Sequence, residues 1–268
     1  MTSRSTERTP AEVYDELFVP ALFQQWGIVV AAAAGVAPNQ RVLDVACGTG
    51  VLACAAAAMV GSDGGVAGVD PNEDMLAVAR RKRTTVAVEW RIGCAESLPF
   101  PDGTFDAVVS QFGFMFFEDR CAALREMARV LRPGGRLAVA VCDALDHSPG
   151  YAVLAELLHR LFGEEVAQAF RAPFACGDPE GLLAVCAEAG ISNAEVTRHD
   201  GTVGFASANA LVSAERACVW TLGGLLDDAQ FGRLRDQAEE SLRPFTMDDG
   251  SLAFLMPALI ITAERGSS

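Results

Sequence analysis

A carboxylate and a glycine-rich turn stand together near the start of the chain, in the run Asp44-Val-Ala-Cys-Gly48-Thr-Gly50. Because glycine has no Cβ, a turn built on Gly48 and Gly50 lets the backbone approach a ligand closely. A second acid, Asp70, ends the next apolar run, where a carboxylate can accept hydrogen bonds from both hydroxyls of a ribose. The pattern predicts a cofactor that contains adenosine.

Asp44 distinguishes two kinds of adenosine cofactor. The spacing Gly48-x-Gly50-x-x-Ala53 also fits nicotinamide and flavin folds, whose cofactors carry a diphosphate. A buried carboxylate beside that turn would repel a diphosphate. An aminoacyl sulfonium carries a positive ammonium group and a positive sulfur, so the same carboxylate attracts it. A plain turn or cap role for Asp44 is the alternative.

One histidine stands where a general base would be useful. His147 follows the fifth apolar run, at the end of the predicted sheet where Asp44 and Asp70 also fall. An imidazole can take a proton near neutral pH, so His147 is the candidate catalytic residue. An exposed loop histidine without a role is the alternative. No spacing of Cys, His and acidic residues predicts a metal site.

The elements that position these residues alternate regularly between residues 41 and 141. We predict strands over 41–45, 65–69, 86–90, 105–110 and 136–141, and helices over 51–60, 72–83 and 119–131. This alternation predicts a mostly parallel sheet with helices on both faces. Ligands bind such sheets at the carboxyl ends of the strands, which is where the candidate residues lie.

Further elements flank this core. We predict helices over 11–34, 149–171, 178–189, 206–220 and 229–242, and strands over 194–198 and 258–263, with Pro257 indicating an edge or bulge position for the last strand. We therefore divide the chain into three parts. Residues 1–40 are N-terminal helices that cover the cofactor site, 41–205 and 251–268 form the core, and 206–250 form a helical insert over the site of the second substrate.

Composition excludes several classes of partner. The chain has 268 residues, 51% of them hydrophobic, which is enough for one large domain with a real core. Its net charge of −14 repels phosphate backbones and anionic lipid, so we expect neither nucleic acid nor membrane as a partner. The start lacks the apolar stretch of a signal peptide, and the eight cysteines include no CxxC pair. We expect a cytoplasmic monomer or homodimer.

Several motifs, in order, resemble those of the class I S-adenosylmethionine-dependent methyltransferases. The run from Asp44 to Gly50 resembles motif I, with most similarity to the type 11 group that includes ubiquinone and menaquinone biosynthesis methyltransferases. The likeness continues through Gly68-Val-Asp70-Pro-Asn-Glu-Asp-Met75, Ala95-Glu96-Ser-Leu-Pro-Phe-Pro-Asp102, Phe105-Asp106 and Leu131-Arg-Pro-Gly-Gly135. The resemblance implies an α/β fold with a Rossmann-like, doubly wound, mostly parallel seven-stranded sheet and a helical lid. The implied cofactor is S-adenosylmethionine, with S-adenosylhomocysteine as its product.

The resemblance also assigns roles to residues. Gly48 and Gly50 would approach the cofactor, Asp44 would order the loop and attract the ammonium group, and Asp70 would hold the ribose hydroxyls. Met75 would pack on the adenine face, with a plain core position as the alternative. The implied set also includes Ala46, Thr49, Pro71 and Gln111.

The adenine edge departs from the family pattern. Ala95 and Glu96 would lie at this edge, but many relatives have Asp where this chain has Cys94. A thiol is a poor hydrogen-bond acceptor, so Glu96 or a backbone carbonyl would have to accept from the adenine amino group.

An aromatic run follows the fourth predicted strand. In the family, the segment from Ser110 to Phe117 passes beside the methionine part of the cofactor and the methyl group. Apolar side chains there would line a dry acceptor pocket, although about half of them would be ordinary core. The predicted acceptor-binding residues are Phe112, Phe114, Met115 and Phe116 from this run, together with Tyr14, Phe18 and Trp26 from the leading helices.

We therefore predict an enzyme that transfers a methyl group from S-adenosylmethionine to a small, largely apolar molecule. Alignment and desolvation of the nucleophile would supply most of the catalysis, with a base needed only for a protonated acceptor. One alternative is a nicotinamide-dependent oxidoreductase, against which Asp44 speaks. The other is a methyltransferase-like binding protein that holds the cofactor without transferring a methyl group.

Overall fold

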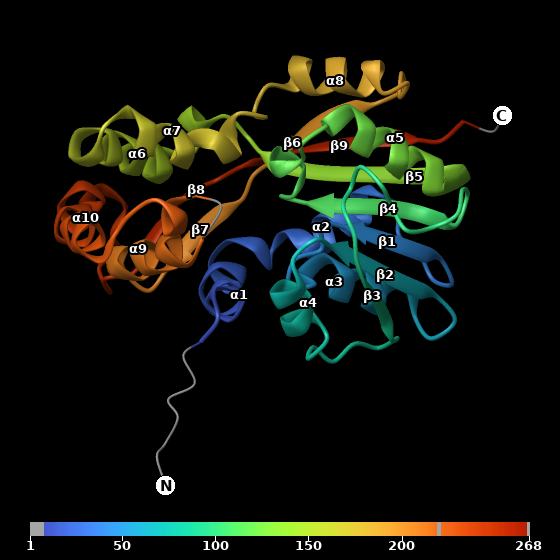
Figure 1. Ribbon diagram of the computed structural model, residues 1–268, viewed down its shortest axis with the longest axis horizontal. Coiled ribbons are helices and arrows are strands. Elements are labelled where there is room, and N and C mark those ends of the chain that lie inside the picture. Colours follow the sequence, from blue (N-terminus) through green and yellow to red (C-terminus); the bar gives the residue numbers. More distant parts are fainter. Residues whose placement is uncertain (1–7, 219–220, 267–268) are drawn as a thin grey trace, which may run out of the picture.

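A seven-stranded sheet forms the centre of the computed structural model, which describes residues 8–218 and 221–266 (Figure 1). The strand order is β3-β2-β1-β4-β5-β9-β6. Of these strands, β9 runs antiparallel to the other six. The predicted Rossmann-like, mostly parallel seven-stranded sheet is thus confirmed. Its strands are β1 (Arg41–Val45), β2 (Gly65–Asp70), β3 (Val88–Ile92), β4 (Phe105–Gln111), β5 (Leu131–Cys142), β6 (Glu195–His199) and β9 (Ala258–Glu264).

Helices cover both faces of this sheet (Figure 1). On one face, α2 (Trp26–Ala33) packs on α3 (Val51–Val60), while α4 (Glu73–Ala79) lies beside β2 and β3. On the other face, α5 (Arg120–Val130) packs against β4, β5 and α8 (Pro179–Glu188). The alanines of α3 let it lie close to the sheet, since Ala53, Ala56 and Ala57 are fully buried. Both faces are dry, as a parallel sheet requires.

The N-terminal segment is helical but irregular. A short α1 (Pro10–Val13) continues into η1 (Tyr14–Phe23), a π-helix that contains Pro20. Proline cannot donate a backbone hydrogen bond, and π-helical turns are uncommon outside functional sites. The sequence predicts ordinary helices here, because the spacing of apolar residues does not distinguish an α-helix from a π-helix.

A second group of helices gathers beyond one end of the sheet (Figure 1). We use the name helical layer for α6 (Pro149–Phe162), α7 (Glu164–Arg171), α9 (Ala208–Ala217), α10 (Asp228–Ser241) and the antiparallel pair β7 (Thr202–Phe205) and β8 (Leu252–Leu255). Within it, α10 packs on both α6 and α9. Short helical turns connect these elements and those of the core: η2 (Phe114–Phe116), η3 (Leu145–His147), η4 (Ala172–Phe174), η5 (Leu222–Gly224) and η6 (Arg243–Phe245).

The structure corrects several predicted boundaries. The predicted insert of 206–250 packs together with α6 and α7, which had been assigned to the core. The β7–β8 pair was not predicted, and α4 ends at Ala79 rather than 83. The edge position inferred from Pro257 was wrong, because β9 lies between β5 and β6 and the proline precedes the strand. Predicted segments that include 1–7, 219–220 and 267–268 extend beyond the described residues.

The apolar helices of the described segments were also compared with the length of a membrane span. No single helix among them is long and apolar enough to cross a bilayer; the pair Pro10–Phe23 and Trp26–Ala33, bent by 65°, reaches that length and composition only when taken together.

Candidate functional site

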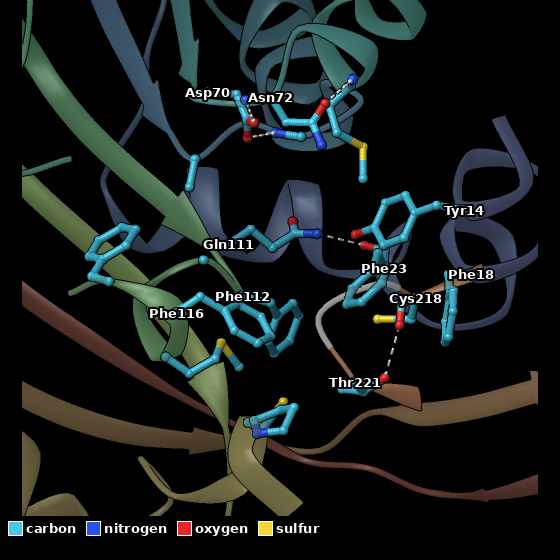
Figure 2. A pocket seen from close by; sticks show the side chains of 18 of the residues that line it. Tyr14, Phe18, Phe23, Asp70, Asn72, Gln111, Phe112, Phe116, Cys218 and Thr221 are labelled. Atoms are coloured by element: carbon cyan, nitrogen blue, oxygen red, sulfur yellow. Dashed lines mark hydrogen bonds between the residues drawn. The ribbon is translucent and has the colours of Figure 1, made fainter. Parts of the chain in front are cut away.

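A cavity of about 860 Å³ opens at the carboxyl ends of the strands, between the sheet and the helical layer (Figure 2). Its volume is typical of small-molecule sites. The last or following residues of β1, β2, β3, β4 and β5 all contribute to it. The predicted residues on its wall are Tyr14, Phe18, Ala46, Gly48, Asp70, Pro71, Met75, Cys94, Ala95, Glu96, Gln111, Phe112, Met115 and Phe116.

The glycine turn after β1 has one residue facing the cavity and one facing the core. Gly48 has a φ of +52°, and a Cβ built on it would meet nothing within 4 Å. Gly50 has a φ of +86°, but a Cβ there would lie 2.5 Å from the ring of Trp90. Turn geometry and packing against Trp90 therefore require glycine at position 50. In the same turn, Ala46 also has a positive φ of +57°, which is strained for a residue with a side chain.

A small pit of about 30 Å³ extends the cavity wall toward Asp44 and Thr49. Asp44 is 1% exposed; its Oδ2 accepts from the backbone N–H of Ala53 at 2.9 Å. Its Oδ1 and the Thr49 hydroxyl have no hydrogen-bond partner among the described residues. Burial raises the pKa of Asp44 well above its ordinary value, and the nearby Asp70 adds to this. A cation in the pit would offset that cost.

Gln111 lies across the same pit at the end of β4. Its side-chain amide donates to the Phe23 carbonyl at 3.0 Å, which fixes the orientation of the side chain. In the described part of the chain, its Oε1 is buried without a partner. Together with the two oxygens of Asp44 and Thr49, it forms an acceptor set suited to an ammonium group.

Asp70 lies at the end of β2 and is held by two backbone groups. Its Oδ2 accepts from Gly48 N–H at 2.8 Å and its Oδ1 from Asn72 N–H at 2.9 Å. Each oxygen keeps a lone pair that could accept from a hydroxyl. Burial raises the pKa of Asp70 although both hydrogen bonds lower it. Asp70 and Asn72 lie at one end of the site in Figure 2.

The predicted adenine region surrounds this end. Met75 is 4% exposed and packs with Tyr14 while facing the cavity, so its core and cavity roles coexist. Cys94 is exposed after β3. Glu96 lines the cavity, but its Oε1 accepts from the backbone N–H groups of Glu118 and Asp119 at 3.0 and 3.4 Å. Glu96 thus anchors the loop before α5 as well as lining the cavity.

The aromatic run after β4 divides between cavity and core. Phe112 has a φ of +55°, which turns the chain sharply at the strand end. Phe112, Met115 and Phe116 line the cavity as predicted. Phe114 does not: it is fully buried against Phe117, at 5.6 Å between ring centroids. Phe117, in turn, lines the cavity.

The leading helices contribute a second aromatic wall. Tyr14 stacks on Phe23 at 5.4 Å and 26°, and Phe23 contacts Phe112 at 5.5 Å. Tyr14 and Phe18 line the cavity as predicted. Trp26 does not, because it is 1% exposed and packs edge-on behind Phe112 at 5.7 Å. It supports the wall from the core side.

His147 lies outside the cavity wall. Its side chain is 46% exposed, and its Nδ1 lies 2.9 Å from Oδ2 of the buried Asp143, which also pairs with Arg198 at 2.8 Å. The strand residue Cys142 reaches the cavity, and the turn that follows carries the histidine toward solvent. The predicted base role therefore has no support in the geometry.

Sequence reasoning missed most of the cavity wall from the helical layer. Glu215 and Cys218 come from α9 and its end, Thr221 follows, and Tyr151 begins α6. Figure 2 shows Cys218 and Thr221 at the end of the site remote from Asp70. Glu215 is 4% exposed, and burial raises its pKa to about 8. A carboxylate on an amphipathic helix is ordinarily solvated, so nothing in the pattern marked it.

Comparison with known proteins gives a family match for part of the core. Residues 43–139 match the family described as a methyltransferase domain. Over 132 residues the chain is 40% identical to the ubiquinone/menaquinone biosynthesis C-methyltransferase UbiE of Escherichia coli, which covers 48% of this chain and 53% of that protein. The chain thus spans about half the length of the curated relatives it matches. The resemblance predicted from the motifs is confirmed over these residues, and with it S-adenosylmethionine as the cofactor of the domain.

Solved structures extend the likeness in fold. The YcgJ protein of Bacillus subtilis is 21% identical with a TM-score of 0.60, covering 91% of this chain and 100% of that one. The cyclase SpnF is 22% identical with a TM-score of 0.57, covering 92% of this chain and 82% of its own. At this identity the comparison establishes architecture, and function must be argued from the site.

Proposed function

Since residues 43–139 are a methyltransferase domain, we propose that the protein transfers the methyl group of S-adenosylmethionine to a small, largely apolar molecule bound in the cavity. The observation that carries the proposal is the set of buried oxygens on Asp44, Thr49 and Gln111 that have no partner among the described residues, near the Asp70 carboxylate. The first three suit an ammonium group, and Asp70 suits a ribose. A diphosphate cofactor would find no complementary charge there.

Each residue of the site would bind the part of the cofactor nearest to it. When bound, S-adenosylmethionine supplies a methyl carbon made electrophilic by its positive sulfur. Asp44 and Gln111 would hold the amino-acid end, Asp70 the ribose, and Met75 the adenine face. The chain's contribution is to fix the direction of attack and to keep water out, which are the two effects that such a displacement needs most.

The wall of the cavity supports an apolar acceptor. Phe112, Phe116 and Phe117 face it from the segment after β4, and Tyr14 and Phe18 from η1. A flat, water-excluding wall of this kind binds aromatic, isoprenoid or polyketide-like surfaces through area burial. With His147 outside the wall, alignment and desolvation remain the main source of rate.

The surrounding elements would act as a cover. We propose that α1 and η1 close the cofactor end and that the helical layer closes the acceptor end, with α6 and α7 added to the predicted insert. The support is that Tyr14, Tyr151 and Glu215 reach the cavity from these elements. We also propose a cytoplasmic monomer or homodimer; residues 8–218 and 221–266 contain no disulfide, as a reducing compartment favours.

Methyl transfer can be tested with methyl-labelled S-adenosylmethionine and a panel of aromatic, isoprenoid and polyketide-like acceptors. We expect the label to move to at least one acceptor, with S-adenosylhomocysteine formed in equal amount. Formation of no labelled product, with cofactor binding intact, would favour the binding-protein alternative.

The matched variant is Asp70→Ala. Loss of two ribose hydrogen bonds should weaken cofactor binding by about 10- to 100-fold. An Asp70→Ala protein that binds the cofactor as tightly as the wild type would contradict the ribose assignment.

A further inference from the structure

Glu215 is a buried carboxylate on the cavity wall for which the methyl-transfer site described above has no use. It lies on α9, is 4% exposed, and its Oε2 accepts from the Thr221 hydroxyl at 3.2 Å. Within the described segments, that hydroxyl is the one hydrogen-bond partner of the Glu215 carboxyl group. Tyr151 of α6 lines the same cavity, and the charge of Glu215 contributes to raising the pKa of Tyr151. One hydroxyl does not offset the loss of water around a carboxylate.

The charge on the whole wall has one sign. Five carboxylates line the cavity, and within residues 8–218 and 221–266 no Lys, Arg or His does; the carboxylates are Asp70, Glu73, Glu96, Glu118 and Glu215. Arg120 is close by, but it donates to the carbonyls of Phe114 and Met115. Asp70 and Glu96 belong to the cofactor end. Glu215 is the buried carboxylate that remains for the acceptor.

We propose, resting on the methyltransferase function above, that Glu215 recognises the acceptor as a cationic amine: a basic nitrogen on an apolar or aromatic body. An ammonium group beside Glu215 forms a charge-assisted hydrogen bond with the carboxylate. The rings of Tyr151, Phe170 and Phe174 on the same wall favour a cation over their faces. The same wall repels carboxylate and phosphate acceptors.

The ionisation of Glu215 gives amine binding a defined pH dependence. Burial raises the pKa of Glu215 to about 8, so the free protein holds it protonated at neutral pH, whereas a cation binds the ionised form. Affinity for an amine should therefore rise by about tenfold per pH unit from pH 6 toward pH 8.

Two tyrosines near α9 do not change charge in this range. Burial raises the pKa values of Tyr14 and Tyr151, so both stay neutral. Cys218 follows α9 on the same wall. On the outer side, Asp228 of α10 pairs with Arg216, and Glu12 of α1 pairs with Arg81 at 2.9 Å.

Three probes with one apolar body separate charge from shape: phenethylamine, phenethyl alcohol and 3-phenylpropionate. Calorimetric titration should show the amine binding at least about tenfold tighter than the alcohol, with the carboxylate weakest. In Glu215→Gln, which keeps the size and the Thr221 contact, the amine should fall to the affinity of the alcohol while the alcohol is unchanged. Glu239→Gln, which removes an exposed charge from α10, should change neither.

The outcomes are distinct. Amine binding that is undetectable, no tighter than that of the alcohol, or unaffected by Glu215→Gln would overturn the proposal; the last result would indicate a hydrogen bond to a neutral group instead. S-adenosylhomocysteine is titrated in parallel. If S-adenosylhomocysteine binds but the amine binds no tighter than the alcohol, this inference is wrong and the methyltransferase proposal stands. If S-adenosylhomocysteine does not bind, the proposed methyltransferase function is contradicted.

Discussion

Asp44 holds two oxygens in different environments. One accepts from the backbone of Ala53 and orders the start of α3, and the other faces the pit without a partner in the described chain. A carboxylate used only as a cap would have no reason to bury the second oxygen unsatisfied. The unsatisfied oxygen therefore supports the proposal that a ligand presents a positive group at this point.

Asp44→Asn should weaken binding of S-adenosylhomocysteine by about 10- to 100-fold, the value of a hydrogen bond to a charged group. Binding of 5′-methylthioadenosine, which lacks the amino-acid part, should be unchanged. Isothermal titration of both ligands checks this. Equal losses for both would mean that Asp44 holds the loop and not the ligand.

Glu215 should also leave a signature in stability. Its pKa is raised from 4.5 in the unfolded chain to about 8, so the folded state binds the extra proton and loses stability as pH rises. Between pH 6 and pH 8 the free energy of unfolding should fall by about 2 kcal/mol from this group. Urea denaturation of Glu215→Gln should show a flatter pH dependence by that amount, and Glu239→Gln should follow the wild type. Parallel curves for wild type and Glu215→Gln would refute the burial of an ionisable group there.

Residue types after strand ends were predictable because short motifs fix them. Asp44 lies near the end of β1, Gly48 follows it and Asp70 ends β2, and a parallel sheet brings such positions to one edge. The direction of a side chain was not predictable in the same way. The positive φ of Phe112 turns the following run, so Phe114 enters the core while Phe117 reaches the cavity.

At the scale of elements, the turn after β1 packs closely against the turn after β4. A Cβ on Gly113 would lie 2.5 Å from the Cβ of Ala46, and both turns carry a non-glycine residue with positive φ. Backbone strain of this kind persists only where packing holds it, and it is found at binding sites. The two turns thus share one rigid floor beneath the cavity.

Gly113→Ala should push these turns apart. We expect a loss of about 1–3 kcal/mol in the free energy of unfolding, as for other overpacked sites, together with weaker cofactor binding. Gly204→Ala in β7 is the control, because a Cβ there meets nothing within 4 Å. Denaturant melts and titration of both variants test the point, and a Gly113→Ala protein that matches the control on both would exclude a shared floor.

Elements were predictable where periodicity is strong and local. The strands of the core and the start of α4 follow from short patterns. The helical layer could not be predicted in this way, because it is held together by contacts between elements far apart in the sequence, such as α6 and α10. For the same reason, the wall residues that α6 and α9 contribute were missed, Glu215 among them.

At the scale of the whole molecule, two bodies of structure meet over one cavity. Residues at the ends of the strands line the cavity, and so do residues of η1 and the helical layer. The net charge of −14 and the acidic wall act in the same direction, favouring cations and repelling anions. An enzyme of this design would close over its ligands to exclude water.

Closure should be visible in hydrogen exchange. S-adenosylhomocysteine should slow exchange in residues 10–23 and in the turn after β1, because both face the cavity. Helix α8, which packs on the outer face against α5 and β6, should not change. Equal protection of α8 would indicate general stabilisation of the fold in place of a cover.

The central claim is that the pit and Asp70 select a cationic adenosine cofactor. Calorimetric titration of the protein with S-adenosylmethionine, S-adenosylhomocysteine and NAD⁺ tests it most directly. We predict saturable one-to-one binding of the two adenosyl-sulfur compounds and none of the dinucleotide. Binding of NAD⁺ with no response to either sulfur compound would contradict the account.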